Sequence, residues 1–340
     1  MASNEEVAVV ETGLKILMVT SEVVPFAKAG GLGDMVAALS AELQRQGNEV
    51  RIILPRYYSI DIGRMQRISG PLGVPLGEKE EWCAVYQSRL PNAEVPVYFL
   101  DHEVLYGRDG IYGTSGEPGF ADNLQRFALL SRGAFQLCRV LEWFPDVMHS
   151  HDWPSAIVPV CLNARESEGE FADTGSMLTI HNLGHQGVFP MEEFGKLPVS
   201  PDLYSSAGFE TPDGLNLLQA GIQNADVLTT VSPTYAEEIQ TPEFGCGLDA
   251  LLRERERDLF GVLNGMDYEV WNPETDLHIP ANYSHDDLGG KAVNKAALQE
   301  AMGLDVEPRV PVVAMISRLV DQKGWGQVCG PTHGSLWSIC

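Results

Sequence analysis

Short apolar runs alternate with amphipathic segments over most of the 340-residue chain. Apolar residues that recur every three or four positions predict helices, and short, mostly apolar runs between turn residues predict strands. The predicted strands are Leu14–Thr20, Glu49–Leu54, Val95–Leu100, Pro145–His149, Met177–Ile180, Asp226–Val231 and Leu259–Leu263. Between them, the main predicted helices are Leu32–Gln46, Phe120–Val140 and Trp153–Leu162. Strands that alternate with helices indicate an α/β fold with a parallel, doubly wound sheet.

A polar segment broken by proline, Trp271–Asp276, interrupts this pattern and is typical of a crossover between domains. After it the pattern predicts a helix at Lys291–Met302 and a strand at Val310–Ile316. Too few residues follow for a doubly wound domain of ~100 residues, so we expect the second domain to be incomplete. The expected organisation is a disordered N-terminus (1–13), a Rossmann-like domain (14–270), a crossover with the start of a second Rossmann-like domain (271–324) and an atypical tail (325–340).

Composition and charge restrict the partners of the chain. It is 44% apolar and 21% charged, which is ordinary for a globular protein, and its net charge is −24. Such an acidic surface repels nucleic acid and anionic membranes, so we expect a neutral partner or an anion held by a local basic pocket. The six cysteines lack CxxC spacing and predict reduced, mostly buried thiols. The acidic N-terminus and the lack of a long apolar run predict a cytoplasmic protein without a membrane span.

The loop Lys28–Asp34 joins the first predicted strand to the first predicted helix. Glycines at such a turn allow close approach of a ligand, and the following helix directs unpaired N–H groups and its positive dipole end toward an anion. The spacing fits neither a P-loop nor a dinucleotide-binding fingerprint, which argues against an NAD-type oxidoreductase. Lys28 adds a full positive charge. The alternative is a tight turn with a solvated lysine.

Histidines and an aspartate follow two other predicted strands. His149, His151 and Asp152 suggest a metal site, as do His181 and His185 at a spacing of four residues. We expect His149 and His151 to face opposite ways, however, and Asn182 and Gly184 disfavour the helix that would bring His181 and His185 to one face. We therefore interpret His149 as a structural histidine. Asp152 and His181 are better interpreted as polar groups that converge at the edge of the sheet.

Two basic residues, Arg318 and Lys323, flank the loop after the predicted strand at Val310–Ile316. Basic residues on a loop are usually solvated. In a chain with 23 basic against 47 acidic residues, however, the pair can form a local positive spot.

Several of these segments together resemble bacterial glycogen synthases and plant starch synthases. Lys28-Ala29-Gly30-Gly31-Leu32 is similar to the family's Lys-x-Gly-Gly-Leu signature, although the family more often has Thr or Val at the position of Ala29. The segments 149–153 and 181–187 match His-x-His-Asp-Trp and His-Asn-Leu-x-x-Gln-Gly, and Arg318 with Lys323 matches Arg-x-x-x-x-Lys. The resemblance extends from about residue 14 to residue 324.

The resemblance implies roles for individual residues. The catalytic group would be His181, Asp152, Arg318 and Lys323, and the residues that bind ADP-glucose would be Lys28, Gly30, Gly31, Asp34, Tyr112 and Asn264. Asp152 would hydrogen-bond sugar hydroxyls or the surrounding network, and His181 would lie near the anomeric carbon with its carbonyl stabilising positive charge. Arg318 and Lys323 would neutralise the leaving diphosphate, since a planar fork and a point charge suit two phosphates. Asn264 before Gly265 fits turn chemistry equally well.

The resemblance also implies a GT-B glycosyltransferase with two Rossmann-like domains. Its reaction would move glucose from ADP-glucose to the non-reducing end of an α-1,4-glucan with retention, without a metal or other cofactor. Family contacts beyond Lys323 have no counterpart here, so this chain is expected to be poorly active, and the alternative is a non-catalytic glucan-binding fragment. The sequence leaves open whether the donor is ADP-glucose or UDP-glucose and which oligomer the protein forms. It also leaves open whether the source is bacterial or the protein is an enzyme of the plastid stroma without its transit peptide.

Overall fold

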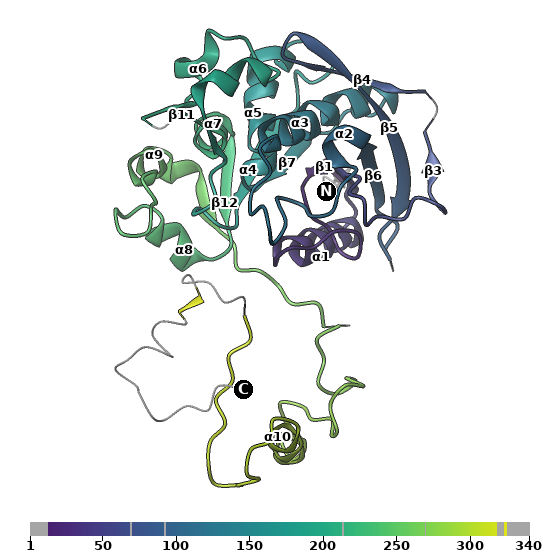
Figure 1. Ribbon diagram of the computed structural model, residues 1–340, viewed down its shortest axis with the longest axis vertical. Coiled ribbons are helices and arrows are strands. Elements are labelled where there is room, and N and C mark those ends of the chain that lie inside the picture. The colour runs from purple at the N-terminus through teal and green to yellow at the C-terminus, as the bar shows by residue number, and fades with distance from the viewer. Residues whose placement is uncertain are drawn as a thin grey trace, which may run out of the picture. The chain divides into compact units, whose positions relative to one another are not determined.

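The computed structural model describes residues 13–317, apart from residues 69, 92, 213 and 269, together with residues 323–324. The chain divides into two compact units, Met1–Gly265 and Met266–Cys340, which are described separately (Figure 1). The predictions for residues 1–12, for Arg318 and for the tail at 325–340 lie outside the described residues. The assignment of residues 271–324 to a nucleotide-binding domain stays a prediction.

The first unit contains a ten-stranded sheet with the order β13-β12-β8-β7-β1-β2-β6-β5-β3, in which β4 also pairs with β5. These strands are β1 (Lys15–Val19), β2 (Glu49–Pro55), β3 (Gln66–Arg67), β4 (Leu72–Leu76), β5 (Lys79–Arg89), β6 (Pro96–Asp101), β7 (Val147–His151), β8 (Gly175–Ile180), β12 (Val227–Thr230) and β13 (Leu259–Gly261). A small antiparallel sheet consists of β9 (Val188–Phe189), β10 (Glu210–Thr211) and β11 (Gly214–Asn216). The α/β fold predicted from the alternating pattern is confirmed.

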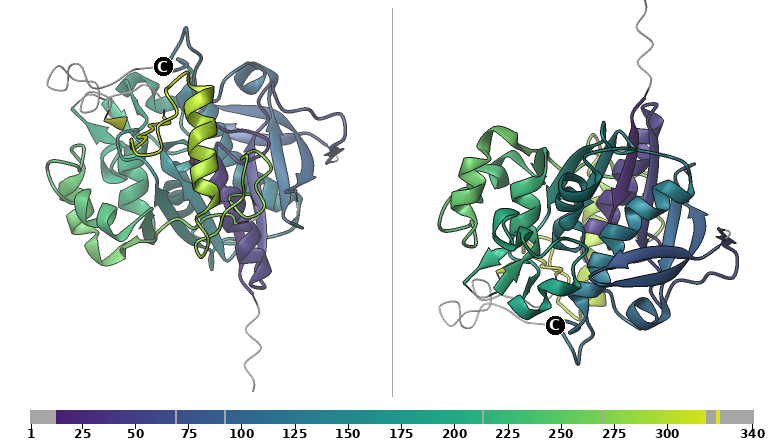
Figure 2. Two further views of the ribbon diagram at one scale, coloured as in Figure 1. Left: turned by 90° about the horizontal axis from the view of Figure 1, so that it is seen from below. Right: turned by 90° about the horizontal axis from the view of Figure 1, so that it is seen from above.

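The strands from β13 to β6 along this order are parallel, as predicted, whereas β3, β4 and β5 pair antiparallel. This antiparallel part, which was not predicted, lies at one edge of the sheet (Figure 2). The α-helices of the first unit are α1 (Leu32–Arg45), α2 (Glu103–Tyr106), α3 (Asn123–Val140), α4 (Asp152–Ser155), α5 (Ile157–Cys161), α6 (Leu203–Ser206), α7 (Leu217–Asn224), α8 (Pro233–Glu238) and α9 (Asp249–Glu254). A π-helical turn, Leu162–Glu166, follows α5, and 3₁₀ turns occur at Met191–Lys196 and Glu256–Asp258.

Both faces of the central sheet are buried. Ile16 and Met18 of β1 belong to the core beneath α1, and Leu17 and Val19 belong to the core formed with α3 and α5. This alternation follows the two-residue period of a strand. Figure 1 shows α1 and α3 on opposite sides of β1. The central strands are therefore rigid supports for the loops at their ends.

The sheet order places a topological switch point between β1 and β7. From β1 the chain first builds β2 and β6 on one side, and later builds β7, β8, β12 and β13 on the other. Loops that leave the carboxyl ends of adjacent strands in opposite directions open a crevice at such a point. The loop after β1 and the turn after β7 both begin there, so the fold brings the segments of residues 20–34 and 151–153 to one edge.

The second unit contains α10 (Gly290–Ala301), close to the helix predicted at Lys291–Met302. The strand predicted at Val310–Ile316 is wrong, because this segment has no regular structure and its Val313 and Ile316 side chains are 72% and 98% exposed. An apolar run forms a strand only when a neighbouring strand satisfies its backbone groups, and the described part of this unit supplies none. Among the described residues, no helix is long and apolar enough to cross a membrane.

Candidate functional site

The loop after β1 ends at Gly31, which is the N-cap residue of α1. The Lys28 ammonium forms an ion pair with Asp34 in the first turn of α1, with an Nζ–Oδ2 distance of 2.7 Å. Both side chains are about half exposed (52% and 50%), so the charge of Lys28 stays accessible to a ligand. The helix begins without a hydrogen bond from a capping side chain. The lysine and the helix N-terminus therefore lie together, as the sequence predicts.

A carboxylate that the sequence did not single out lies behind this loop. Glu22 is 3% exposed, and its Oε2 accepts hydrogen bonds from the backbone N–H groups of Ala29 and Gly30, the latter at 2.9 Å. Its Oε1 accepts a hydrogen bond of 2.7 Å from the hydroxyl of Tyr112. Two consecutive N–H groups thus converge on one oxygen, a geometry typical of an anion-binding nest.

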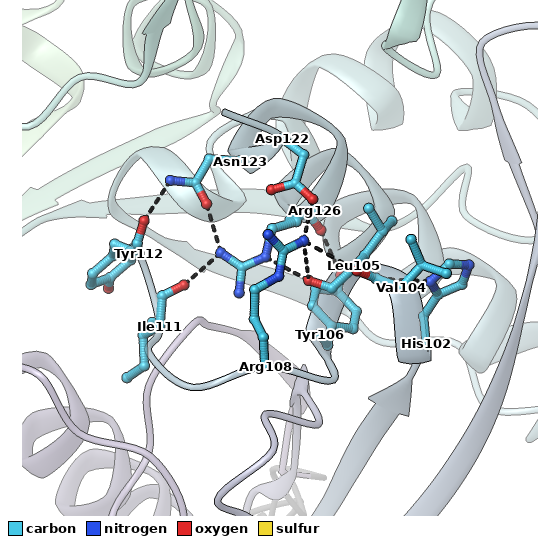
Figure 3. Close-up of polar contacts among 10 residues, drawn as sticks. All are labelled: His102, Val104, Leu105, Tyr106, Arg108, Ile111, Tyr112, Asp122, Asn123 and Arg126. Atoms are coloured by element: carbon cyan, nitrogen blue, oxygen red, sulfur yellow. Dashed lines mark hydrogen bonds and ion pairs between the residues drawn. The ribbon is translucent and has the colours of Figure 1, made fainter. Parts of the chain in front are cut away.

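The loop that bears Tyr112 is held by the start of α3 (Figure 3). Asn123 donates to the Tyr112 carbonyl at 2.8 Å, and the buried Arg126 guanidinium donates to the carbonyls of Ile111 at 2.6 Å and Leu105 at 2.7 Å. Arg126 also donates to the side-chain oxygen of Asn123 at 2.6 Å. Burial, followed by the charge of Glu22, raises the pKa of Tyr112 well above its ordinary value, so its hydroxyl is a hydrogen-bond donor at neutral pH.

Asp152 begins α4 directly after β7 and has a φ of +53°, a conformation that is uncommon for residues other than glycine. Its Oδ1 accepts hydrogen bonds from the backbone N–H groups of His181 at 2.7 Å and Asn182 at 3.2 Å. Burial raises the pKa of the Asp152 carboxyl to about 7, against the effect of these two hydrogen bonds. The structure therefore brings Asp152 and His181 together across the ends of β7 and β8, as predicted.

The expectation that His149 and His151 face opposite ways is wrong. Their ring centroids are 4.2 Å apart, because residues two apart on a strand share a face. His151 Nδ1 lies 3.3 Å from His181 Nε2, and His149 Nε2 is hydrogen-bonded to the Thr179 hydroxyl at 2.6 Å. Burial is the main cause that lowers the pKa of His149 to about 3 and that of His181 to about 4, so both rings are neutral at pH 7. The hydrogen bond of His149 supports its structural interpretation.

An aromatic contact connects Tyr112, which lies beside the loop after β1, with Trp153, which lies beside Asp152. The ring centroids of Tyr112 and Trp153 are 6.1 Å apart, and Trp153 also contacts Phe189 at 6.0 Å. Trp153 and Phe189 line an open cavity of about 920 Å³. Its remaining lining residues are Gly119, Phe120, Ala121, Asn123, Gly184, His185, Gln186, Gly187, Val188, Pro190, Glu193 and Cys246. Cys246 is exposed, whereas Cys83, Cys138 and Cys161 are free and buried as predicted.

The described contacts do not test the placement of three further predicted site residues. Asn264 is exposed in the segment after β13. Lys323 is exposed in the second unit, and Arg318 lies outside the described residues. The roles assigned to these three residues, and to the other site residues, stay predictions.

Sequence reasoning missed Glu22, Trp153 and Phe189 as site residues. Glu22 follows β1 by only three positions, and Trp153 is adjacent to Asp152. Their positions after strand ends were the available signal. No local pattern indicated that Phe189 would lie beside Trp153, since the two residues are on different elements.

The arrangement defines an α/β protein that presents a lysine-bearing glycine loop, a buried Asp–His pair and an aromatic cavity at the switch point of a mostly parallel sheet. The family model for the starch synthase catalytic domain matches residues 15–254, and the chain belongs to that family. The resemblance inferred from the sequence motifs is thereby confirmed.

Individual relatives agree with this assignment. The chain is 50% identical over 327 residues to a glycogen synthase of Treponema denticola, covering 96% of this chain and 67% of the relative. It is 46% identical over 317 residues to glycogen synthase 1 of Geobacter sulfurreducens, covering 92% and 63%. The structure of the catalytic domain of starch synthase IV from Arabidopsis thaliana, bound to ADP and acarbose, matches with a TM-score of 0.82 and 32% identity over 93% of this chain and 65% of that one. The chain thus spans about two thirds of the length of these proteins.

Proposed function

We propose that this protein transfers glucose from ADP-glucose to the non-reducing end of an α-1,4-glucan with retention, as a GT-B glycogen or starch synthase. The observation that supports this most is the meeting of the Lys28 loop, Tyr112 and the Asp152–His181 pair at the β1/β7 edge in a chain of the starch synthase family. The related starch synthase IV structure is described as bound to ADP and acarbose, which agrees with a nucleotide-sugar donor and a glucan-like acceptor.

In this proposal the departure of ADP is assisted by positive groups around the diphosphate. Lys28 and the N-terminus of α1 supply part of this charge, and Arg318 and Lys323 supply the rest. Donors already in position stabilise the charge that develops on the leaving group, so the chemistry requires neither an acid–base side chain nor a metal cofactor. Gly30, Gly31 and Asp34 shape the loop, while Asn264 contacts the donor.

The Asp152 carboxylate orients the His181 carbonyl, which is proposed to stabilise positive charge at the anomeric carbon. The N–H of Asn182 belongs to the same peptide group as the His181 carbonyl, and it donates to Asp152 Oδ1. In a trans peptide the C=O and N–H point in opposite directions, so this hydrogen bond directs the His181 carbonyl away from Asp152. A carbonyl fixed in this way stabilises the positive charge that develops on the sugar during transfer.

The acceptor glucan is proposed to bind in the cavity beside Trp153 and Phe189. Aromatic side chains offer flat apolar faces to sugar rings, and polar groups such as Asn123, Gln186 and Glu193 at the wall are suited to hydroxyl groups. A neutral glucan is also compatible with a net charge of −24, whereas nucleic acid is not. For a protein with this proposed activity, the proposed location is the cytoplasm, or the plastid stroma of a plant.

The test is transfer of labelled glucose from ADP-glucose, and separately from UDP-glucose, to glycogen. Lys28→Ala should lower kcat/KM for the donor by about 10²- to 10³-fold, because it removes a charge that stabilises the leaving group. Lys79→Ala, which removes another exposed lysine at the start of β5, is the matched control and should leave the rate unchanged. If the unchanged protein transfers glucose and Lys28→Ala transfers it at the same rate, the diphosphate role of this loop is refuted.

Glucan binding without transfer is the second candidate, because the aromatic cavity lies entirely within the first unit. The 340-residue chain would then co-sediment with glycogen and produce no labelled glucan. Trp153→Ala should release it from glycogen in either case. Transfer at a rate typical of an active synthase would exclude this candidate.

A further inference from the structure

Glu22 is a buried anion inside a loop that is proposed to bind an anion. Its three hydrogen-bond partners are the N–H groups of Ala29 and Gly30 and the hydroxyl of Tyr112. Among the described ion pairs, no lysine or arginine pairs with it. A buried carboxylate that relies on hydrogen-bond donors alone requires all of them in place.

This arrangement decides which groups of the loop remain for a ligand. The N–H groups of Ala29 and Gly30 are directed inward to Glu22, so a diphosphate cannot use them without displacing a carboxylate that is 3% exposed. The groups that flank them are Lys28, whose ammonium is exposed, and Gly31, where α1 begins without a capping side chain. The inward hydrogen bonds thus determine where the lysine and the helix N-terminus lie.

The Glu22 carboxylate also contacts the loop that bears Tyr112. Tyr112 donates to Glu22 Oε1, and its backbone is fixed by Asn123 at the start of α3. The Glu22 side chain therefore links the loop after β1 to the loop before α3, which come from elements far apart in the sequence. A displacement of Glu22 would move both loops.

We propose that Glu22 is a positioning residue for the donor: its carboxylate holds Ala29 and Gly30 so that Lys28 and the N-terminus of α1 face the diphosphate, and it holds Tyr112 for the sugar. This inference rests on the proposed function of the Lys28 loop. The property that matters is the reach of the two terminal atoms of the side chain to three partners, and the negative charge is secondary. Glutamine has the same reach without the charge: its oxygen can accept from the N–H groups of Ala29 and Gly30, and its NH2 group can donate to the Tyr112 hydroxyl, which can in turn donate to the Ser21 hydroxyl 2.8 Å away. Aspartate keeps the charge and is shorter by one methylene.

A positioning role and a charge role therefore predict opposite results: aspartate is the damaging substitution in the first case, and glutamine in the second. Glu22→Asp should raise KM for ADP-glucose by about 10- to 100-fold, because two or more hydrogen bonds to a charged group are lost, while KM for glycogen changes by less than about twofold. Glu22→Gln should stay within about fivefold of the unchanged protein in both constants. Glu42→Asp is the matched control on the exposed face of α1, where Glu42 pairs with Arg45, and it should change neither constant.

Hydrogen exchange of the peptide that contains residues 27–31 gives a readout independent of turnover. Exchange should accelerate in Glu22→Asp and not in Glu22→Gln. The inference is overturned if Glu22→Asp folds and matches the unchanged protein in donor KM and exchange, or if Glu22→Gln raises donor KM more than tenfold. The latter result decides the question even if Glu22→Asp does not fold. If the unchanged protein transfers no glucose and does not bind ADP, the proposed function fails, and the exchange rates alone decide whether Glu22 holds the loop.

Discussion

Gly187 lies where the cavity wall contacts the ring of Trp153, and its replacement by alanine is expected to disturb both stability and glucan binding. The residue has a φ of +66°, and a Cβ atom there would lie 2.5 Å from Cε3 and 3.0 Å from Cδ2 of Trp153. The left-handed conformation costs an alanine about 1–2 kcal/mol. Displacing a packed ring costs about 1–3 kcal/mol more, so Gly187→Ala should lower the free energy of unfolding by about 2–5 kcal/mol.

Gly169 provides the matched control, because it has a φ of +88° and a Cβ atom there would meet nothing within 4 Å. Gly169→Ala therefore includes the conformational cost without the steric one, and it should lose only about 1–2 kcal/mol. Urea unfolding followed by circular dichroism measures both variants, and m-values that match the unchanged protein confirm that the comparison is valid. The difference between the two variants isolates the contact with the indole ring.

The displaced ring should also weaken glucan binding. Affinity for maltoheptaose, followed by tryptophan fluorescence, should fall by about tenfold in Gly187→Ala, corresponding to about 1.4 kcal/mol, and should be unchanged in Gly169→Ala. Equal losses of stability in the two variants would show that Trp153 is not constrained by Gly187. Normal maltoheptaose affinity in a folded Gly187→Ala protein would refute the placement of the acceptor in this cavity.

Two further predictions concern buried carboxyl groups. The pKa of Asp152 is about 7 in the folded protein, against an ordinary value of 3.8. Its contribution to the free energy of unfolding is therefore complete below pH 4 and is lost as the pH rises toward 7, a decline of no more than about 4 kcal/mol. Asp152→Asn should remove this decline in urea unfolding measured from pH 4 to 8. Glu166→Gln should cost about 3–5 kcal/mol, because it leaves the buried Arg132 without its ion pair, whereas Glu170→Gln, on a half-exposed pair, should cost no more than about 1 kcal/mol. A similar loss of unfolding free energy in these two glutamine variants would contradict the conclusion that the buried ion pair contributes more than the exposed one.

The elements of the central sheet could be predicted because their patterns are strong and local. β1, β2 and β8 are mostly apolar runs between turn residues, and α1 repeats apolar residues at helical spacing. The hairpin of β4 and β5 was missed, although Gly77 lies between the strands with a φ of +59°. Pro75 within β4 and the polar residues at the start of β5 obscure the strand pattern, and an edge position tolerates both.

Part of the candidate site could be predicted because parallel strands end at one edge. This rule was sufficient to associate Asp152 with His181 and to place Lys28 at the same edge of the sheet, since all three follow strand ends. It could not show that the Asp152 side chain accepts the N–H of His181, since that contact depends on the positive φ of Asp152. The inward direction of the N–H groups at Ala29 and Gly30 was also inaccessible, because it depends on the conformation of the loop and not on its composition.

The proposed anion site has to operate in a protein with a net charge of −24, and the contacts of Lys28 explain how. Glu22 uses the two inward N–H groups, and Asp34 pairs with Lys28, so the loop has little net positive charge without a ligand. An ion pair this exposed contributes only about 0–1 kcal/mol, so the oxygens of an incoming diphosphate can replace the Asp34 carboxylate as the partner of Lys28 at low cost. The Glu22 contacts, in contrast, are buried and costly to break. The loop therefore combines a fixed inner anion with an outer one that is easily replaced, which gives the donor access to Lys28 while the backbone around it stays in place.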